Sequence, residues 1–459
     1  MSGRAIVRRI GTDLPDVVRW GAAVGLLVCV AAGIGVLTVQ SAVMALLAGI
    51  AVLAVGMATV NLSLVAMLTF PATLVMIRVG GALSVSDVIL AAATVPCLLL
   101  MRFKEAADLK PLLWLGLTYQ AMLLPTLALN PYGANFVEWV HEAFLVGGSL
   151  IVGWVAGRYG HARKTINIYT ALCCVLAVAT IIMAIIWFGE YGKFLPVSLP
   201  NFHKNFIGNT LAYTFLIAFV RPKWLGWSQR VCVALMALSA VGIAASQARQ
   251  SVISVLVAVV ILSFRGRQAG LGKARVLLIM LLPALWVVVR TVQDQLALHD
   301  NFNSTSQRLI WFAQSIEIWK TSPLFGVGLR WWYTGDYPMF QPPNGILEML
   351  SSAGIVGVLA FLILFGGATW VIFKLDPRYG NIALAIVVAR FTQGELDLYW
   401  VAGQASFLWL ITGLAYGLQA SERYHLSIQP EDPLPAEQRP TQMARQVVHG
   451  PRWRLPADR

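Results

Sequence analysis

The sequence predicts an all-α, polytopic integral membrane protein, with about 12–14 transmembrane helices and one long external loop that carries short helices. Of its 459 residues, 58% are hydrophobic and only 12% are charged, whereas soluble domains carry roughly 25% charged residues. The apolar residues also form blocks close to the length of a membrane-spanning helix, about 17–25 residues. This composition excludes a soluble enzyme, a nucleic-acid-binding domain and a disordered chain.

The order of these blocks divides the chain into five regions. A basic cytoplasmic N-terminus (1–19) precedes transmembrane helices (20–290), an external, periplasmic-side loop (291–344), further transmembrane helices (345–418) and a disordered basic cytoplasmic tail (419–459). The block near Ile382 is short and is the weakest. Spans are expected near Trp20–Leu37, Ala42–Val60, Leu62–Ile77, Asp87–Met101, Pro111–Leu129, Phe136–Val155, Ile166–Trp187, Phe206–Val220, Val231–Ala245, Val252–Phe264, Val276–Val289, Gly345–Phe373, Ile382–Val388 and Tyr399–Leu418.

Basic residues indicate the orientation of the chain. Cytoplasmic loops of membrane proteins are enriched in Lys and Arg. Alternating the spans from a cytoplasmic N-terminus places both termini and most of the 34 Lys and Arg residues inside. The lipid bilayer therefore accounts for the net charge of +13, with no nucleic-acid partner. The basic residues left outside are Arg78, Lys193, Lys204, Arg249, Arg290, Arg308, Lys320, Arg330 and Arg390.

Cysteines and nucleotide motifs give no sign of a cofactor. All five cysteines lie in apolar blocks, so we expect packing residues and neither a disulfide framework nor a cysteine-based zinc site. No Walker A run is present, which argues against ATP-driven transport by this chain. The cysteines are Cys29, Cys97, Cys173, Cys174 and Cys232.

Two external segments are long, Phe188–Asn205 and Thr291–Asn344. In the second, Ser306–Lys320 has the periodicity of an amphipathic helix, and Pro323 and the glycines that follow end it. A helix of this kind beside the bilayer is also typical of a simple interfacial helix. Its expected apolar face consists of Leu309, Phe312, Ala313 and Ile316.

Three ordered motifs resemble the O-antigen ligase/polymerase family. They are Ser306-Gln307-Arg308-Leu309-Ile310-Trp311, then Pro323-Leu324-Phe325-Gly326-Val327-Gly328, then Asn344-Gly345-Ile346-Leu347-Glu348, which leads to Gly354-Ile355-Val356-Gly357. Upstream, Ser246-Gln247-Ala248-Arg249 and His203-Lys204-Asn205-Phe206-Ile207-Gly208 also resemble segments of the family. The motifs cover about Ser246–Gly357.

The resemblance implies a membrane glycosyltransferase that takes a glycan from a polyprenyl diphosphate on the outer face of the membrane. Ligases of the family pass the glycan to a lipid or other acceptor, and polymerases pass it to another carrier-linked repeat. No metal and no nucleotide sugar is implied, because the diphosphate is itself the leaving group. Expected partners are the polyprenyl-diphosphate-linked donor, a glycan or lipid acceptor, and other polysaccharide-assembly proteins.

Arginines are the expected ligands of the departing diphosphate. Fixed cations stabilise charge that develops on a leaving group, and the planar guanidinium binds phosphate oxygens bidentately. The resemblance favours Arg249 and Arg308 in this role, against snorkelling to headgroups or a structural ion pair. Lys204 and His203 are expected to add substrate contacts, with a headgroup contact as the alternative for Lys204. For Arg290, Arg330 and Arg390 the interfacial interpretation is favoured.

The expected general base is less clearly marked. Ligase-type members carry a histidine directly before the asparagine of the third motif, whereas this chain has Pro343 before Asn344. That difference favours a polymerase or a divergent transferase over a strict ligase. Asn344 is assigned to substrate binding, and Glu348, one helical turn further on, is the preferred base. The other candidates are His141, His203, His299, Asp336, Glu395 and Asp397.

Two other functions stay open. A transporter or flippase of lipid-linked sugars would also need basic groups, but near the membrane midplane. In this chain the candidate groups lie at one face and in one long external loop, which favours an enzyme. A catalytically inactive scaffold of glycan assembly is the third interpretation.

Overall fold

Helices make up nearly all of a computed structural model that describes residues 41–80, 83–265, 286, 289, 290, 293, 304–337, 340–401 and 403–428. The prediction of an all-α, polytopic membrane protein is confirmed. In chain order the elements are α3 (Ala42–Val60), η1 (Leu62–Leu64), α4 (Val65–Ala72), β1 (Arg78–Gly80), β2 (Leu83–Ser84), α5 (Val85–Leu100), η2 (Ala107–Leu109), α6 (Lys110–Met122), α7 (Leu124–Leu129), α8 (Gly133–Ala143), η3 (Phe144–Gly148), α9 (Ser149–Arg158), α10 (Ala162–Tyr191), α11 (Lys204–Val220), η4 (Lys223–Leu225), α12 (Gln229–Ser246), α13 (Arg249–Arg265), α15 (Ser304–Thr321), η5 (Trp331–Tyr333), α16 (Gly345–Lys374), α17 (Pro377–Leu396) and α18 (Gln404–Ile428).

Five of the described helical segments are long and apolar enough to cross a membrane: Ala107–Leu129, Gly133–Arg158, Ala162–Tyr191, Gln229–Ser246 and Gly345–Lys374. Shorter apolar helices cover Met44–Val60, Leu62–Ala72 and Val85–Leu100. The expected span Trp20–Leu37 lies outside the described residues, and Val276–Val289 lies almost wholly outside them. The pass count therefore stays a prediction.

Helix α17 runs from Pro377 to Leu396 and is much longer than the weak apolar block near Ile382 predicts. Its second half contains Arg390 and Gln393, whose side chains are buried within the protein. A polar side chain that faces other helices needs no lipid-compatible surface. It lowers the hydropathy of the segment without shortening the helix.

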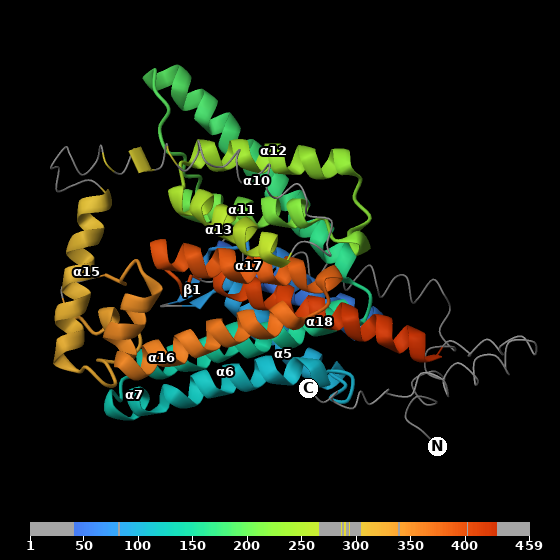
Figure 1. The fold of residues 1–459 in the computed structure, drawn as a ribbon, viewed down its shortest axis with the longest axis horizontal. Coiled ribbons are helices and arrows are strands. Elements are labelled where there is room, and N and C mark those ends of the chain that lie inside the picture. Colours follow the sequence, from blue (N-terminus) through green and yellow to red (C-terminus); the bar gives the residue numbers. More distant parts are fainter. Residues whose placement is uncertain are drawn as a thin grey trace, which may run out of the picture.

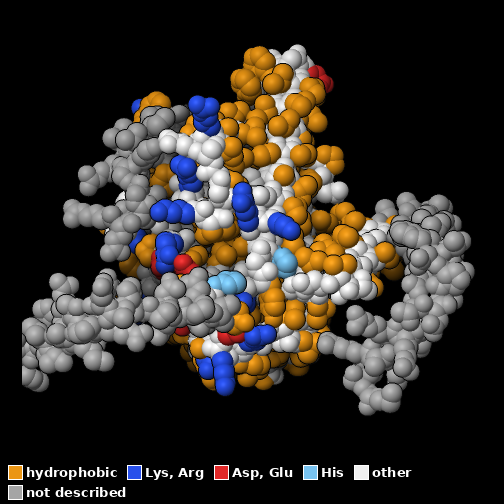
Figure 2. Space-filling view, turned by 90° about the vertical axis from the view of Figure 1, so that its right-hand side faces the viewer, with side chains coloured by type: hydrophobic (Ala, Val, Ile, Leu, Met, Phe, Trp, Pro, Cys, Tyr) orange, Lys and Arg blue, Asp and Glu red, His pale blue; other side chains and the backbone are white. Residues whose placement is uncertain are grey.

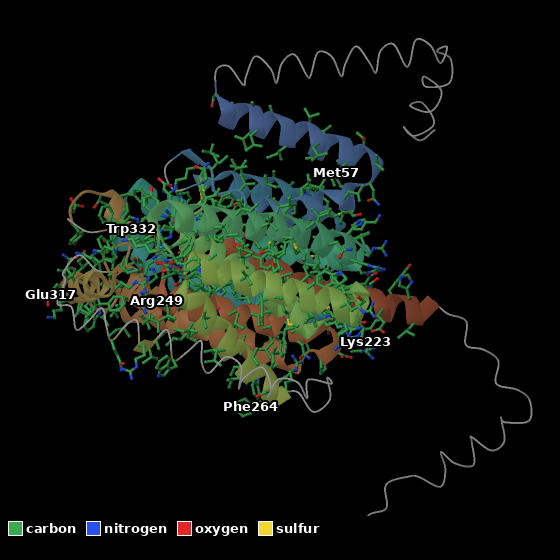
Figure 3. The ribbon with its side chains drawn as sticks, turned by 90° about the horizontal axis from the view of Figure 1, so that it is seen from above. Met57, Lys223, Arg249, Phe264, Glu317 and Trp332 are labelled. Carbon is green, nitrogen blue, oxygen red and sulfur yellow. The ribbon has the colours of Figure 1, made fainter. Side chains whose placement is uncertain are left out.

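Loops that the charge partition places on the cytoplasmic side lie together at one end of the bundle. Arg158 donates to Glu105 at 2.5 Å, and Arg378 pairs with Glu422 at 3.1 Å. Figure 2 views this end and shows Lys and Arg side chains gathered over it, with few acidic groups. In Figure 3, Lys223 lies at this end and Arg249 at the opposite one.

Helices α9 and α18 pack with their backbones in direct contact. A Cβ at Gly153 or Gly157 would overlap α18 backbone atoms, and a Cβ at Gly413 or Gly417 would overlap α9 backbone atoms. Small residues four positions apart allow this close approach between helices in a membrane. The glycines therefore allow the two helices to pack at backbone contact along this length.

Helix α15 lies across the end of the bundle opposite the basic loops (Figure 1). The helix expected over Ser306–Lys320 is present, and the face that it packs on the protein differs from its expected apolar face. Ile318 is buried against Trp331, with Trp311 beside it, whereas Leu309 and Ile316 are exposed. Tertiary contacts of the two tryptophans, which periodicity does not register, select the buried face.

Candidate functional site

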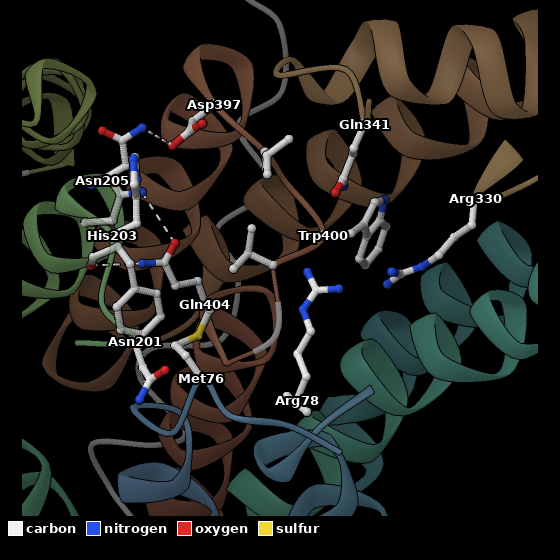
Figure 4. Close-up of a pocket in the computed structure, with 15 residues that line it drawn as sticks. Met76, Arg78, Asn201, His203, Asn205, Arg330, Gln341, Asp397, Trp400 and Gln404 are labelled. Carbon is white, nitrogen blue, oxygen red and sulfur yellow. Dashed lines mark hydrogen bonds between the residues drawn. The ribbon is translucent and has the colours of Figure 1, made fainter. Parts of the chain in front are cut away.

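A polar cavity of about 400 Å³ lies at the end of the bundle that the charge partition assigns to the outer face. Helix α11, the loop after α17 and the segment before α5 supply most of its walls (Figure 4). The cavity carries two arginines, one histidine and one carboxylate among several amides. Its lining is Met76, Arg78, Ser84, Asn201, His203, Asn205, Phe206, Asn209, Arg330, Gln341, Asp397, Leu398, Trp400, Val401 and Gln404.

The glycine-rich turn of the second motif is docked onto a break in α16. Gly354 has φ 65° and ψ −160°, which interrupts the helix. The turn supplies the missing partners: the amides of Val327 and Gly328 donate to the carbonyls of Ser351 and Ser352 at 3.0 and 2.8 Å. In return, the amide of Ile355 donates to the Pro323 carbonyl at 2.9 Å. The second and third motifs thus form one structural unit.

Helices α7 and α8 hold the other side of this turn. The Asn135 side chain accepts from the Leu329 amide at 2.9 Å, and the Tyr132 hydroxyl donates to the Leu329 carbonyl at 2.8 Å. Thr126 donates to the Phe325 carbonyl at 2.8 Å. These contacts fix the backbone that leads into Arg330.

Arg330 is a buried residue and not an interfacial one, so that expectation is wrong. Its side chain is 6% exposed, and Nε donates to Oε2 of the buried Glu138 at 2.5 Å. Arg330 adopts the left-handed conformation, with φ 55°, which turns its side chain inward to the cavity. Glu138 also contacts His141, at 3.0 Å, and His141 contacts Asp87 at 3.1 Å. The hydropathy pattern gave no sign of this ionic chain.

Arg390 is also buried, completely so, and its interfacial assignment is wrong for the same reason. Its guanidinium donates to the carbonyls of Leu398 and Tyr399 and to Gln404. It therefore shapes the loop that carries Asp397 and Trp400. Arg290 is exposed, with its guanidinium 5.5 Å from the ring centre of Trp286, and its interfacial role stays a prediction.

The turn between α12 and α13 lies directly against the start of α11. Gln247 has φ 53° and makes the reversal that places Arg249 at the first position of α13. Gly208 on α11 has no side chain that could separate it from Ala248. Ser251 donates to Asn209 at 2.9 Å. The two upstream motifs are therefore in contact.

Asp397 ties this turn to the cavity. Its Oδ2 accepts from the Asn205 side chain at 2.7 Å and from Gln250 at 3.4 Å. Asn205 and Gln250 flank Lys204 and Arg249 in the sequence. The carboxylate thus fixes the starts of α11 and α13 relative to each other.

Four of the expected site residues are brought together here. Lys204 lies within electrostatic range of both Arg249 and Arg308, and His203 within range of Arg308. Burial lowers the pKa of His203 from its ordinary value of 6.5; Asp397 opposes this shift, and the cations Lys204 and Arg308 add to it. His203 is thus held neutral at physiological pH. We call Lys204, Arg249 and Arg308 the cationic cluster.

Asn344 and Glu348 have structural contacts. Asn344 caps α16 by accepting from the Leu347 amide at 2.8 Å, and its amide group donates to the Glu395 carbonyl at 2.8 Å. Glu348 is buried and accepts from Gln341 at 2.9 Å. Gln341 lines the cavity, so it separates Glu348 from that space. The substrate role of Asn344 and the base role of Glu348 stay predictions.

The other candidates for the general base lie in different places relative to the cavity. His141 is enclosed between two carboxylates, and Asp336 is exposed outside the cavity. Of the acidic candidates, Asp397 lines the cavity. His299 lies outside the described residues. Within the described parts of the chain, no three His, Cys, Asp or Glu residues are grouped so that they could hold a metal ion.

Fold and site together define a class: a polytopic, all-helical membrane protein with a cation-bearing polar cavity at one end. Residues 234–362 match the family model described as O-antigen ligase. This match confirms the resemblance that the motifs show over that stretch. The matched stretch contains Arg249, Arg308 and the docked turn, whereas His203 and Asp397 lie outside it. Among curated proteins no match to the chain is found.

Proposed function

We propose that the protein transfers a glycan from a polyprenyl diphosphate to an acceptor hydroxyl at the outer face of the bacterial cytoplasmic membrane. The observation that carries the proposal is the cationic cluster beside the polar cavity. Three cations lie within electrostatic range of one another, with Asp397 as an acidic group within range of Lys204. Like charges this close repel one another, so a bound polyanion such as a diphosphate would be strongly attracted.

The cationic cluster would act on the leaving group. The acceptor oxygen attacks the anomeric carbon, the bond from that carbon to the diphosphate oxygen breaks, and the diphosphate keeps the bonding electron pair. Negative charge grows on the diphosphate during this step, so fixed guanidinium groups stabilise the transition state more than the ground state. The acceptor proton passes to a base, so the step requires no further reactant.

Two carboxylates compete for the role of base. A base must reach the proton directly or through one water. Asp397 lines the cavity, and the hydrogen bonds from Asn205 and Gln250 both go to its Oδ2. Glu348 can act only if Gln341 moves aside or relays the proton. The position of Asp397 therefore favours it over Glu348.

Single-turnover transfer from a synthetic polyprenyl-diphosphate-linked glycan, by purified protein, tests the function. Asp397→Asn keeps the size and one hydrogen-bond acceptor but removes the base. We expect it to reduce transfer by about a hundred-fold or more, within the range for general base catalysis, while donor binding stays near that of the parent. Glu348→Gln tests the competing assignment. Full activity in both variants would exclude both carboxylates.

The products made in cells distinguish the two reactions of the family. Deletion of the gene should leave single unextended repeats on the surface if the protein is a polymerase, and unattached long polymers if it is a ligase. Pro343 in place of the usual histidine favours the first result. Repeats trapped on the inner face would indicate a flippase and contradict the proposed transfer.

A further inference from the structure

A second pair of cations, Arg78 and Arg330, lies on the wall of the cavity opposite His203 and Asp397 (Figure 4). Tyr333 joins the two arginines. Arg78 Nη1 donates to the Tyr333 hydroxyl at 3.0 Å, and the Arg330 guanidinium lies 5.7 Å from the centre of the same ring. This pair belongs to different elements from the cationic cluster and has no role in the leaving-group chemistry proposed above.

Both arginines are held in place by the surrounding fold. Arg330 is fixed through Nε by the buried Glu138, so its terminal Nη groups point toward the cavity (Figure 4). Arg78 lies on β1, which pairs with β2, and Arg78 is opposite Ser84. Ser84 in turn starts α5 through a capping box with Asp87. Such preorganisation lowers the entropic cost of binding a ligand.

The charge on this wall suits an oxyanion. Arg78 and Arg330 both contribute positive charge to it, and Glu138, the carboxylate bonded to Arg330, is shared with His141. Guanidinium groups bind carboxylates through paired, charge-assisted hydrogen bonds. Trp400 and Gln341 also line this part of the cavity and would supply a flat apolar face and an amide for a sugar ring.

We infer that Arg78 and Arg330 form a subsite for the carboxylate of an acidic sugar, such as a uronic acid, within the transferred or accepting glycan. The inference rests on the proposed function, because it places the glycan in this cavity. A diphosphate is the poorer occupant, since its polyprenyl chain must stay in the bilayer beside the cationic cluster. The cavity, about 400 Å³, lies within the usual range for small-molecule sites, about 300–1,000 Å³.

Ligand-observed NMR on the full-length protein in nanodiscs tests this subsite with glucuronate, glucose and glucose 6-phosphate. We expect glucuronate to bind at least ten-fold more tightly than glucose. Arg78→Gln should weaken glucuronate binding by about ten- to hundred-fold, the range for a lost hydrogen bond to a charged group. Tyr333→Phe removes the same hydrogen bond to Arg78 but keeps the charge, and it should change binding by less than about three-fold. Equal binding of glucuronate and glucose, or an Arg78→Gln variant like the parent, would overturn the inference.

Farnesyl diphosphate separates this subsite from the proposed function. Its affinity should fall in Arg249→Ala and stay unchanged in Arg78→Gln. If Arg78→Gln loses farnesyl diphosphate binding, the pair holds the diphosphate and the inference is overturned. If only glucose 6-phosphate binds in an Arg78-dependent way, the ligand is a sugar phosphate and the carboxylate assignment is wrong. If Arg249→Ala leaves diphosphate binding intact while glucuronate still binds through Arg78, the proposed function fails and the subsite stands.

Discussion

Arg330 shows how far a single residue can depart from what its sequence neighbourhood indicates. Its neighbours Trp331, Trp332 and Tyr333 are typical of a membrane interface. Arg330 is nevertheless buried and forms an ion pair with Glu138. The partner lies on α8, far away in the chain, and only the fold brings it within reach. A family pattern marks Arg249 and Arg308, whose roles stay predictions. Arg78, Glu138 and Trp400 carry no such pattern.

Removing the Arg330 guanidinium should destabilise the fold. Arg330→Ala removes one of the two partners of the buried Glu138 and leaves only His141; loss of one partner of a buried ion pair typically costs about 3–5 kcal/mol. Thermal unfolding in detergent measures it. Lys320→Ala is the matched control, because Lys320 pairs with Glu317 at 2.7 Å but both side chains are more than half exposed, and such pairs contribute about 0–1 kcal/mol. Equal unfolding temperatures for the two variants would contradict the buried ion pair.

His203 should make the stability of the outer end depend on pH. The pKa of His203 is lowered in the folded state by burial and nearby cations, so the unfolded chain binds the proton more readily. The contribution of neutral His203 to folding stability is fully present above its pKa in the unfolded chain, about 6.5. It is lost as the pH falls through the lowered pKa of the folded state. His203→Asn keeps a helix-capping side chain without titrating between pH 5 and 8.

Unfolding midpoints of the parent and His203→Asn, measured from pH 8 to pH 5, test this behaviour. We expect the parent to lose stability relative to the variant as the pH falls below about 6.5. A constant difference between the two proteins across this range would show that His203 does not titrate differently on folding.

At the scale of elements, the second and third motifs depend on each other structurally. The second motif is a turn whose amides satisfy carbonyls that the Gly354 break exposes in the third. Local rules could predict that Pro323, Gly326 and Gly328 end a helix, but not where the turn docks. The same limit applies to α15, whose buried face depends on Trp331. Local sequence patterns carry no information about contacts between residues that are far apart in the chain.

Gly326→Ala tests the docking of this turn. Gly326 has φ 67°, and an added Cβ would overlap the backbone of Ser352 and Ala353. Gly335→Ala is a matched control, because Gly335 has φ 81° with nothing within 4 Å of an added Cβ. Both variants incur the left-handed strain, about 1–2 kcal/mol. Only Gly326→Ala should add steric overlap, and therefore unfold at a clearly lower temperature and lose transfer activity. Similar behaviour of the two variants would refute the docking.

At the scale of the whole molecule, the two ends of the bundle carry different chemistry. The basic loops joined by pairs such as Arg158–Glu105 lie at one end. The cavity and the cationic cluster lie at the other, where Figure 3 labels Arg249. Composition and loop charge predicted the fold class and this separation. They could not predict the cavity, because its lining comes from segments between Met76 and Gln404 that meet only after folding.

Labelling of introduced cysteines tests which end faces outward. Gly335→Cys, beside the cavity end, should react with an impermeant maleimide in intact cells, whereas Lys104→Cys, in an exposed loop at the basic end, should react only after lysis. The parent chain gives the background: of its described cysteines, Cys97, Cys173 and Cys232 are buried and Cys174 is partly buried. The reverse labelling would invert the proposed orientation.

Glycan transfer by Arg249→Ala and Arg308→Ala decides whether the cationic cluster carries the chemistry. With a synthetic polyprenyl-diphosphate donor and folded, purified variants, each change should slow transfer by about a hundred- to thousand-fold, the effect of losing one transition-state charge contact. Arg→Lys at either position should also be damaging, because it loses the bidentate fork. Lys193→Ala, which removes an exposed cation from the other long loop, should stay within about two-fold of the parent. Near-normal transfer by both Arg249→Ala and Arg308→Ala would contradict the diphosphate role of the cationic cluster.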